Sequence, residues 1–204
     1  MRDETIGSFL TRLAARSAEP GGGATGALHA AQAAALLAMV ARYSDGPRHD
    51  AEVVGRVRAA ADGLADEALD LAEADSAAFA KVIAAYQLPK DTGEEKAARS
   101  GAIAEAMAGA ARPPADLMAA AMRLAGLAED LLAVANRNVI SDIGAAAAAI
   151  GAAAVTAQVN IEANLAGIKD RALIDELTKT AALADGVADR ADRLVTAIRE
   201  EISR

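Results

Sequence analysis

Alanine occupies 59 of the 204 positions, and this one preference restricts the fold more than any motif in the sequence. Alanine is the best helix former among the amino acids and has little preference for strands. Aromatic residues, which favour strands, make up only 2 % of the chain. The composition therefore excludes an all-β fold, argues strongly against a mixed sheet, and predicts an all-α protein.

Proline and glycine divide the chain into helical segments. Prolines stand at positions 20, 47, 89, 113 and 114, and apolar residues recur between them at helical spacing. We expect a single domain over residues 1–204, built as an antiparallel bundle of about seven long alanine-rich helices. The expected helices cover roughly residues 3–17, 24–43, 50–87, 94–111, 113–135, 139–167 and 171–203.

A core made mainly of alanine has an energetic consequence. The side chain is one methyl group, and burial of apolar surface contributes only about 25 cal/mol per Å². Such a bundle gains stability by burying further surface against a second copy of itself. We therefore expect the helices to pair as a homodimer.

The charge balance and the residue types exclude several classes of partner. The chain has 29 acidic and 21 basic residues, and its Lys and Arg residues form no basic stripe of the kind that a phosphate backbone requires, so we expect no nucleic-acid partner. Without cysteine it has no disulfide and no thiol nucleophile. The two histidines, His29 and His49, lie outside the spacings typical of metal sites, so we expect neither a metal nor a cofactor.

One apolar stretch is long enough to raise the question of a membrane span. Residues 143–159 consist mostly of Ala and Gly, whereas Leu, Ile and Phe dominate helices that face lipid. The polar residues Asp142 and Asn160 bound the stretch. The chain also begins with the polar Met1–Glu4 and lacks a signal-peptide apolar segment there. We expect a buried helix in a soluble, cytoplasmic protein with no membrane partner.

Asp75 is the one acidic residue on an otherwise apolar helical stripe. Its neighbours at helical spacing include Leu71 and Phe79. A carboxylate held against such side chains loses water, which raises its pKa toward the range useful for proton transfer. The alternative is a structural acid at a helix–helix seam, where it pairs with an arginine or caps a neighbouring helix.

Amide and carboxylate side chains also gather around the sixth expected helix. Asn136, Asn138 and Asp142 stand at its start, where such residues often serve as caps and turn residues. Asn160 lies five whole turns after Asp142, on the same helix face, and Asn164 follows one turn later. A polar line on an apolar helix indicates either a wet groove or a polar seam between subunits.

A run of three glycines, Gly21–Gly23, leads into the second expected helix. Glycine lets a ligand approach the backbone closely, and a helix N-terminus favours an anion. Neither a Walker sequence nor a preceding strand accompanies the run, so it matches neither a P-loop nor a dinucleotide fingerprint. A simple connecting loop is the other interpretation.

Taken together, these segments resemble the cyclodeaminase/methenyltetrahydrofolate cyclohydrolase family, the helical half of formiminotransferase-cyclodeaminase. The matching features follow one another in the family's order over nearly the whole chain. They are Thr5-Ile6-x-x-Phe9-Leu10, Pro20-Gly21-Gly22-Gly23, Asp75-x-x-x-Phe79, Leu88-Pro89-Lys90-x-Thr92-x-Glu94-Glu95-Lys96-x-x-Arg99, Pro113, Asn136-x-Asn138-x-x-Ser141-Asp142 and Asn160-Ile161 with Asn164.

The resemblance implies an all-α homodimer that binds a reduced folate in a cleft between helices, near the subunit interface. It also implies one of two reactions, neither of which needs a metal. A cyclohydrolase adds water to the methenyl carbon of 5,10-methenyltetrahydrofolate and yields 10-formyltetrahydrofolate; we expect this activity. A cyclodeaminase closes a 5-formimino group onto N10 and releases ammonia. A diverged, non-catalytic helical dimer that binds a ligand is the third reading.

The resemblance also suggests roles for individual residues. Asp75 is expected to carry the proton or to balance the cationic centre, with Asp142 as a second catalytic residue. The expected substrate-binding residues orient the pterin or the water, form a backbone wall, or meet the folate glutamate: Pro20, Gly21, Gly22, Gly23, Phe79, Lys90, Asn136, Asn138, Asn160 and Asn164, with Arg99 beside Lys90.

The chain departs from the family pattern at two of these places. Glu19 precedes the glycines, where the family usually has a small or apolar residue. Gly46-Pro47-Arg48 stands where the family offers Gly-Lys, so a substrate anchor is missing there unless Arg48 takes its place with a different geometry.

Overall fold

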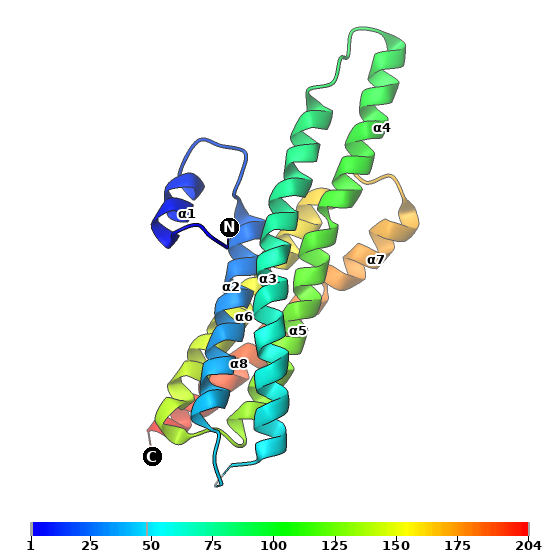
Figure 1. The fold of residues 1–204 in the computed structure, drawn as a ribbon. Coiled ribbons are helices and arrows are strands. Elements are labelled where there is room, and N and C mark those ends of the chain that lie inside the picture. The colour runs from blue at the N-terminus through cyan, green and yellow to red at the C-terminus, as the bar shows by residue number, and fades with distance from the viewer. Residues whose placement is uncertain (1, 48, 204) are drawn as a thin grey trace.

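The structure is a computed structural model that describes residues 2–47 and 49–203, so Arg48 lies outside the described residues. All of its regular elements in these ranges are helical, which confirms the all-α prediction. Figure 1 shows the long helices running side by side in one elongated bundle. The elements are α1 (Ile6–Leu13), α2 (Gly22–Tyr43), α3 (Ala51–Tyr86), α4 (Gly93–Ala110), α5 (Arg112–Leu132), η1 (Arg137–Val139), α6 (Ile140–Leu165), α7 (Arg171–Ala181) and α8 (Leu183–Ile202).

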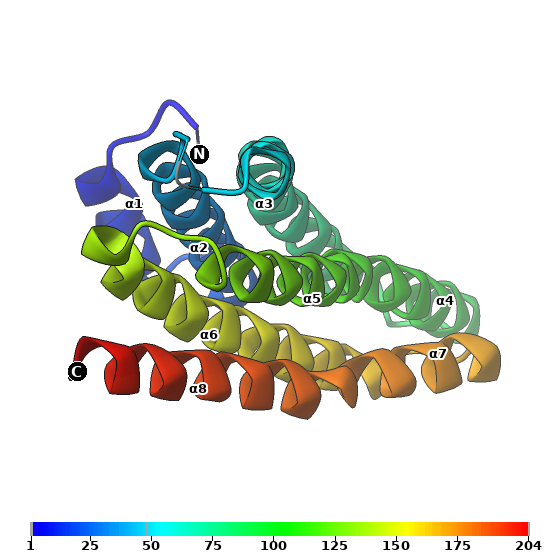
Figure 2. The ribbon, with the colours of Figure 1, turned by 90° about the horizontal axis from the view of Figure 1, so that it is seen from below.

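The bundle has three layers, which Figure 2 shows from below. Helices α2 and α3 form one layer, α5 and α6 the middle one, and α7 with α8 the third. Alanine lets the helices approach closely, and the core is filled in between by larger side chains such as Leu37, Met118 and Ile150, each of which is fully buried. The alanine-rich sequence of α2 and α6 therefore reflects their central positions.

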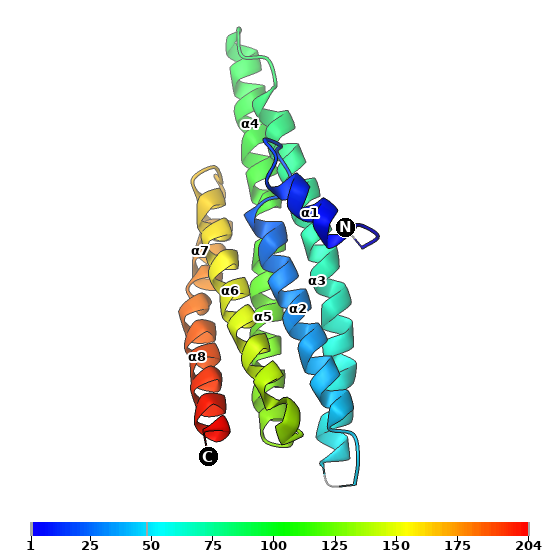
Figure 3. The ribbon, with the colours of Figure 1, turned by 90° about the vertical axis from the view of Figure 1, so that its left-hand side faces the viewer.

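The α3–α4 hairpin extends beyond the other helices (Figures 1 and 3). A capping box begins α4: the Thr92 hydroxyl accepts a hydrogen bond from the Glu95 N–H, and the Glu95 carboxylate accepts one from the Thr92 N–H. Within α4 only Ala110 is fully buried, at the end that joins the bundle. The hairpin thus brings the last turns of α3 beside α4 with little of the core behind them.

Two expected helices differ from the observed ones. The first ends at Leu13 rather than near residue 17, before the chain turns toward Pro20. The segment 171–203 is not one helix but two, because the chain changes direction at Ala182. Helix α7 packs Leu177 into a small cluster around Ile161, whereas α8 packs on the main core. The turn at Ala182 thus separates the helix of the small cluster from the helix of the main core, and the apolar spacing of the segment gives no sign of it.

Two helical stretches, Gly22–Tyr43 and Arg137–Leu165, are long and apolar enough to cross a membrane by length and composition. In the bundle α2 packs against α3, α5 and α6, and more than half of its apolar window is buried, compared with less than half of the α6 window. Core helices pass the same length and composition test as membrane spans. Burial in the bundle accounts for much of the apolar composition of α2, whereas part of the apolar surface of α6 stays exposed.

Candidate active site

A cavity of about 390 Å³ lies where the N-terminus of α2 meets the outer half of α3 and the end of α6. Its volume falls in the range of small-molecule sites. Five parts of the chain line it: the loop before α2 and helices α2, α3, α4 and α6. The lining residues are Ala18, Glu19, Gly21, Gly22, Gly23, Asp75, Ser76, Phe79, Val82, Ile83, Tyr86, Met107, Ala110, Asn160, Ala163 and Asn164.

Asp75 lies at the inner end of this cavity, against the first turn of α2. That turn begins after Gly21, which has no side chain to cap the helix. The Asp75 carboxylate takes over this function from another helix, since it accepts a hydrogen bond from the Ala24 N–H. A Cβ atom at Gly23 would lie only 2.1 Å from Asp75 Oδ1, so the approach of the carboxylate requires glycine there.

The surroundings of Asp75 raise its pKa above the ordinary value of 3.8. The main cause is burial, which withdraws water from the charged form, and the Ala24 N–H opposes it by stabilising the carboxylate. Among the described residues no ion pair is formed by Asp75. A carboxyl group whose pKa is raised in this way is a better proton acceptor than a fully solvated one.

Two amides of α6 form the opposite wall. Asn160 Nδ2 donates to the Thr156 carbonyl at 2.8 Å, and Asn164 Nδ2 donates to the Asn160 carbonyl at 2.8 Å. These bonds to the main chain fix both side chains. Each Oδ1 atom has no hydrogen-bond partner among the described residues, so the two amides offer acceptors to a bound molecule.

The structure therefore brings together seven of the expected site residues. They lie around one cavity as the sequence analysis anticipates: Asp75, Phe79, Gly21, Gly22, Gly23, Asn160 and Asn164. Pro20, the residue before the glycines, is buried beside them. The expected apolar crevice at Asp75 is present, and the amides that face it come from the end of α6.

Asn136, Asn138 and Asp142 do not reach this cavity within one chain, which corrects the expectation that Asp75 faces the start of the sixth helix. Asp142 and Asn160 share a face of α6, but the 18 residues between their positions separate them by about 27 Å along the axis. A shared helical face does not imply proximity. The turn that carries Asn138 and Asp142 belongs to the other end of the bundle.

Asn136 has a structural role at that end. Its N–H donates to the buried Ser44 hydroxyl at 2.8 Å, and its Nδ2 donates to the Tyr43 carbonyl at 3.0 Å. Its Oδ1 accepts from the Asn138 N–H at 3.1 Å. These bonds tie the α5–α6 connection to the end of α2 and engage both ends of the side-chain amide.

The two expected partners of the folate glutamate lie on the extended hairpin. Lys90 is exposed in the α3–α4 turn, outside the residues that line the cavity. Arg99 lies nearer, because its guanidinium stands 5.5 Å from the ring centre of Tyr86 and its Nη2 donates to the Tyr86 carbonyl at 3.1 Å. Tyr86 lines the cavity, so Arg99 marks its outer rim.

Several lining residues were not assigned to the site by sequence reasoning. Ser76 is one of them: its hydroxyl oxygen is buried and without a hydrogen-bond partner in the described part of the chain. Met107 comes from α4, and only the tertiary packing of the hairpin reveals its position. Tyr86 did carry a signal, since it follows Asp75 and Phe79 on one stripe of α3. In residues 2–47 and 49–203 no three His, Cys, Asp or Glu side chains form a group that could hold a metal ion.

Known proteins provide an independent comparison. The chain is 37 % identical over 180 residues to the methenyltetrahydrofolate cyclohydrolase of Methylorubrum extorquens, which covers 87 % of this chain and 86 % of that protein. It is 32 % identical over 171 residues to the formimidoyltransferase-cyclodeaminase of Rattus norvegicus, and the match covers 82 % of this chain but only 32 % of that longer protein.

A solved structure also has this fold. The crystal structure of formiminotetrahydrofolate cyclodeaminase from Thermotoga maritima superposes with a TM-score of 0.82 at 28 % identity, over 97 % of this chain and 98 % of that one. The sequence model of the formiminotransferase-cyclodeaminase family matches residues 5–183. This match spans most of the sequence, including every residue that lines the cavity, and the chain belongs to the formiminotransferase-cyclodeaminase family.

Proposed function

We propose that this chain is a methenyltetrahydrofolate cyclohydrolase that converts 5,10-methenyltetrahydrofolate to 10-formyltetrahydrofolate. The observation that carries the proposal is the unpaired, partly buried Asp75 carboxyl at the inner end of a cavity with amide acceptors on its other wall. The Methylorubrum extorquens relative that bears this activity in its name matches over nearly its whole length.

The proposed reaction requires one group that takes up a proton and later returns it. Water attacks the cationic methenyl carbon, a C–O bond forms, and Asp75 accepts one proton from the water. The bond between that carbon and N5 then breaks, Asp75 returns its proton to N5, and the hydroxyl proton leaves as the formyl group forms. A raised pKa suits this role because it makes the carboxyl a better proton acceptor in the first step.

The other cavity residues would position the folate. The Oδ1 atoms of Asn160 and Asn164 match the N–H donors of a pterin ring, and Phe79 supplies an aromatic face. The backbone of Gly21–Gly23 forms the wall beside Asp75. Arg99 at the rim and Lys90 farther out would meet the glutamate carboxylates, which trail from the pteridine toward solvent.

A formiminotetrahydrofolate cyclodeaminase is the second candidate, favoured by the similarity to the Thermotoga maritima structure. The test follows the absorbance of 5,10-methenyltetrahydrofolate with purified protein, and measures ammonia released from the formimino compound. Loss of the methenyl absorbance above the uncatalysed rate, without ammonia release from the second substrate, is the expected result. Ammonia release alone would replace the first candidate by the second, and inactivity in both assays would favour a non-catalytic ligand-binding dimer.

We propose in addition that the protein is a soluble, cytoplasmic homodimer. Helix α6 supports the dimer, because one of its faces is exposed and free of charge between Ser141 and Glu162 (Figure 3). The face advances alternately by four and three residues, a spacing that a second helix can follow. Its members are Ser141, Ala145, Ala148, Ala152, Val155, Val159 and Glu162.

Two such faces fit together better in an antiparallel pairing than in a parallel one. It sets Val159 opposite Ala145 of the partner subunit and Val155 opposite the partner's Ala148, so large side chains meet small ones. A parallel pairing would set valine on valine and alanine on alanine. The antiparallel register also carries Asn138 and Asp142 of the partner subunit toward Asn160, and in this way the expected roles of Asn138 and Asp142 are kept.

Mixing two inactive variants tests this arrangement. Asp75→Asn and Asp142→Asn are each expected to be inactive as pure dimers. Mixed in equal amounts and allowed to exchange subunits, they should recover about one quarter of wild-type activity, because half of the dimers then hold one intact site. The measurement is the methenyl absorbance assay, with sedimentation to confirm the dimer. No recovery, or full activity of Asp142→Asn alone, would contradict the shared arrangement.

A further inference from the structure

The charges that line the cavity are all of one sign. Among its described lining residues the only ionisable acids and bases, apart from Tyr86, are Glu19 and Asp75. No Lys, Arg or His side chain lines it, and Arg99 at the rim is directed to the Tyr86 carbonyl. The interior therefore has a negative potential that a cationic ligand would balance.

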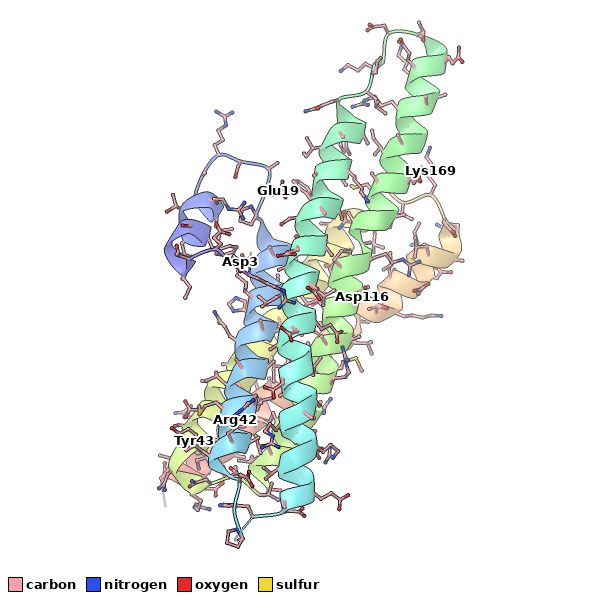
Figure 4. All side chains as sticks on the ribbon, viewed as in Figure 1. Asp3, Glu19, Arg42, Tyr43, Asp116 and Lys169 are labelled. Atoms are coloured by element: carbon pink, nitrogen blue, oxygen red, sulfur yellow. The ribbon has the colours of Figure 1, made fainter. Side chains whose placement is uncertain are left out.

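Glu19 comes from the segment between α1 and α2, where Figure 4 labels it, and it lines the cavity. Its backbone is held on both sides. The Ser17 hydroxyl donates to the Glu19 carbonyl at 2.9 Å, and the following Pro20 is buried. The Glu19 side chain is exposed and forms no ion pair with another described residue. Its carboxylate is thus free to act on whatever enters the cavity.

The proposed substrate and product differ by one charge at the reacting centre. In 5,10-methenyltetrahydrofolate a positive charge is shared by N5, the methenyl carbon and N10. In 10-formyltetrahydrofolate the same atoms are neutral. Asp75 exchanges a proton during the reaction and its pKa is raised, whereas Glu19 has no step of the chemistry to perform. A fixed carboxylate at the entrance can therefore favour one ligand over the other throughout turnover.

We propose that Glu19 is a specificity-determining residue that selects the cationic methenyl folate over the neutral formyl folate. The inference rests on the proposed function and refines it, since it names the form of folate that the cavity prefers. The Glu19 carboxylate attracts the positive charge of the bound substrate from a distance. The product lacks that charge, so it loses this attraction and leaves more readily. Because the side chain is exposed and screened by salt, its effect is modest, about two- to fivefold in the dissociation constant.

Equilibrium binding isolates this effect from catalysis. The dissociation constants of two folates are measured in an Asp75→Asn background, with and without Glu19→Gln. The two are 5,10-methenyltetrahydrofolate and 5-formyltetrahydrofolate, and the second is neutral at N5 and N10. The cation should bind about two- to fivefold more weakly after the change, and the neutral folate should bind equally well. The difference should shrink as the ionic strength rises. Asp189→Asn, an exposed acid on α8, is the matched control and should change neither constant.

The possible outcomes separate this inference from the proposed function. Equal weakening of both folates would assign Glu19 to holding the loop and overturn charge selection, as would no change in either constant. A preference for the cation that depends on Glu19, in a protein without cyclohydrolase turnover, would support the inference and overturn the proposed reaction. Failure of wild-type protein to bind either folate would overturn the substrate class itself.

Discussion

Replacing Asp75 with asparagine should lower the turnover of 5,10-methenyltetrahydrofolate by about 10²- to 10⁴-fold, the usual contribution of a positioned acid or base. The amide keeps the size of the side chain and an oxygen that accepts from the Ala24 N–H. It cannot take up a proton from water or return one to N5. The loss should therefore appear in kcat, while KM changes much less.

The same variant should be as stable as the wild type or more so at pH 7. In the folded protein the Asp75 pKa lies above 3.8, mainly because burial disfavours the charged form. The folded state thus binds the proton more tightly than the unfolded state. Its stabilising contribution is complete below pH 3.8 and is lost as the pH rises through the raised pKa. Asparagine is neutral at every pH and avoids that loss.

Urea unfolding of both proteins from pH 7 toward pH 4 measures this difference. The advantage of Asp75→Asn in the free energy of unfolding should shrink as the pH falls. Far-UV circular dichroism checks that the fold is unchanged. Near-normal kcat in a folded variant would remove Asp75 from the mechanism, and a constant stability difference over this range would contradict the raised pKa.

Replacing Gly23 with alanine should abolish most of the activity without removing any polar group. The new Cβ would lie 2.1 Å from Asp75 Oδ1 and 2.4 Å from its Cγ, well inside contact distance. Either the carboxylate leaves the N-terminus of α2 or the two helices separate. We expect a loss of about 1–3 kcal/mol in the free energy of unfolding, as in other overpacked sites, and a fall in kcat close to that of Asp75→Asn.

Gly55→Ala is the matched control for this substitution. Gly55 also lies in a helix, but no atom lies within 4 Å of the position where its Cβ would be placed. Alanine there should raise the free energy of unfolding by up to about 1 kcal/mol through helix propensity and leave kcat unchanged. Thermal unfolding and the absorbance assay, run on both variants, make the comparison. Full activity of Gly23→Ala would show that the close approach of Asp75 is dispensable.

The fold could be predicted from the sequence because its main determinants are local. Alanine content, proline positions and caps such as Thr92 with Glu95 act within a few residues, and they place most helix boundaries correctly. The break at Ala182 has no such local signal. Leu177 before the break and Leu194 after it belong to different clusters, and cluster membership is a property of the packed bundle.

The residue types of the candidate site could be predicted from the sequence, but the positions of these residues relative to one another could be predicted only in part. Asp75 was recognisable because a carboxylate on an apolar stripe stands out, and Gly23 belonged to a visible glycine run. Helical periodicity also put Asp142 and Asn160 on one face of α6. It gives the direction in which each side chain leaves the helix, but it does not bring together residues that are far apart along the helix axis. The structural role of Asn136 depends on Ser44, which is 92 residues away in the sequence, and no pattern within one helix reveals such a pairing.

The extended α3–α4 hairpin divides the site into two halves that differ in local stability. Gly23 and Asp75 are held where α2 packs against α3, next to the alanine core, whereas Tyr86 and Met107 belong to the last turns of α3 and to α4, which have few buried side chains. Helical segments with few buried side chains open locally at a small fraction of the free energy of global unfolding. The outer wall can therefore yield to let a bulky ring system in or out while the inner end keeps its geometry, so exchange of ligands with solvent does not require the Asp75 carboxyl to move.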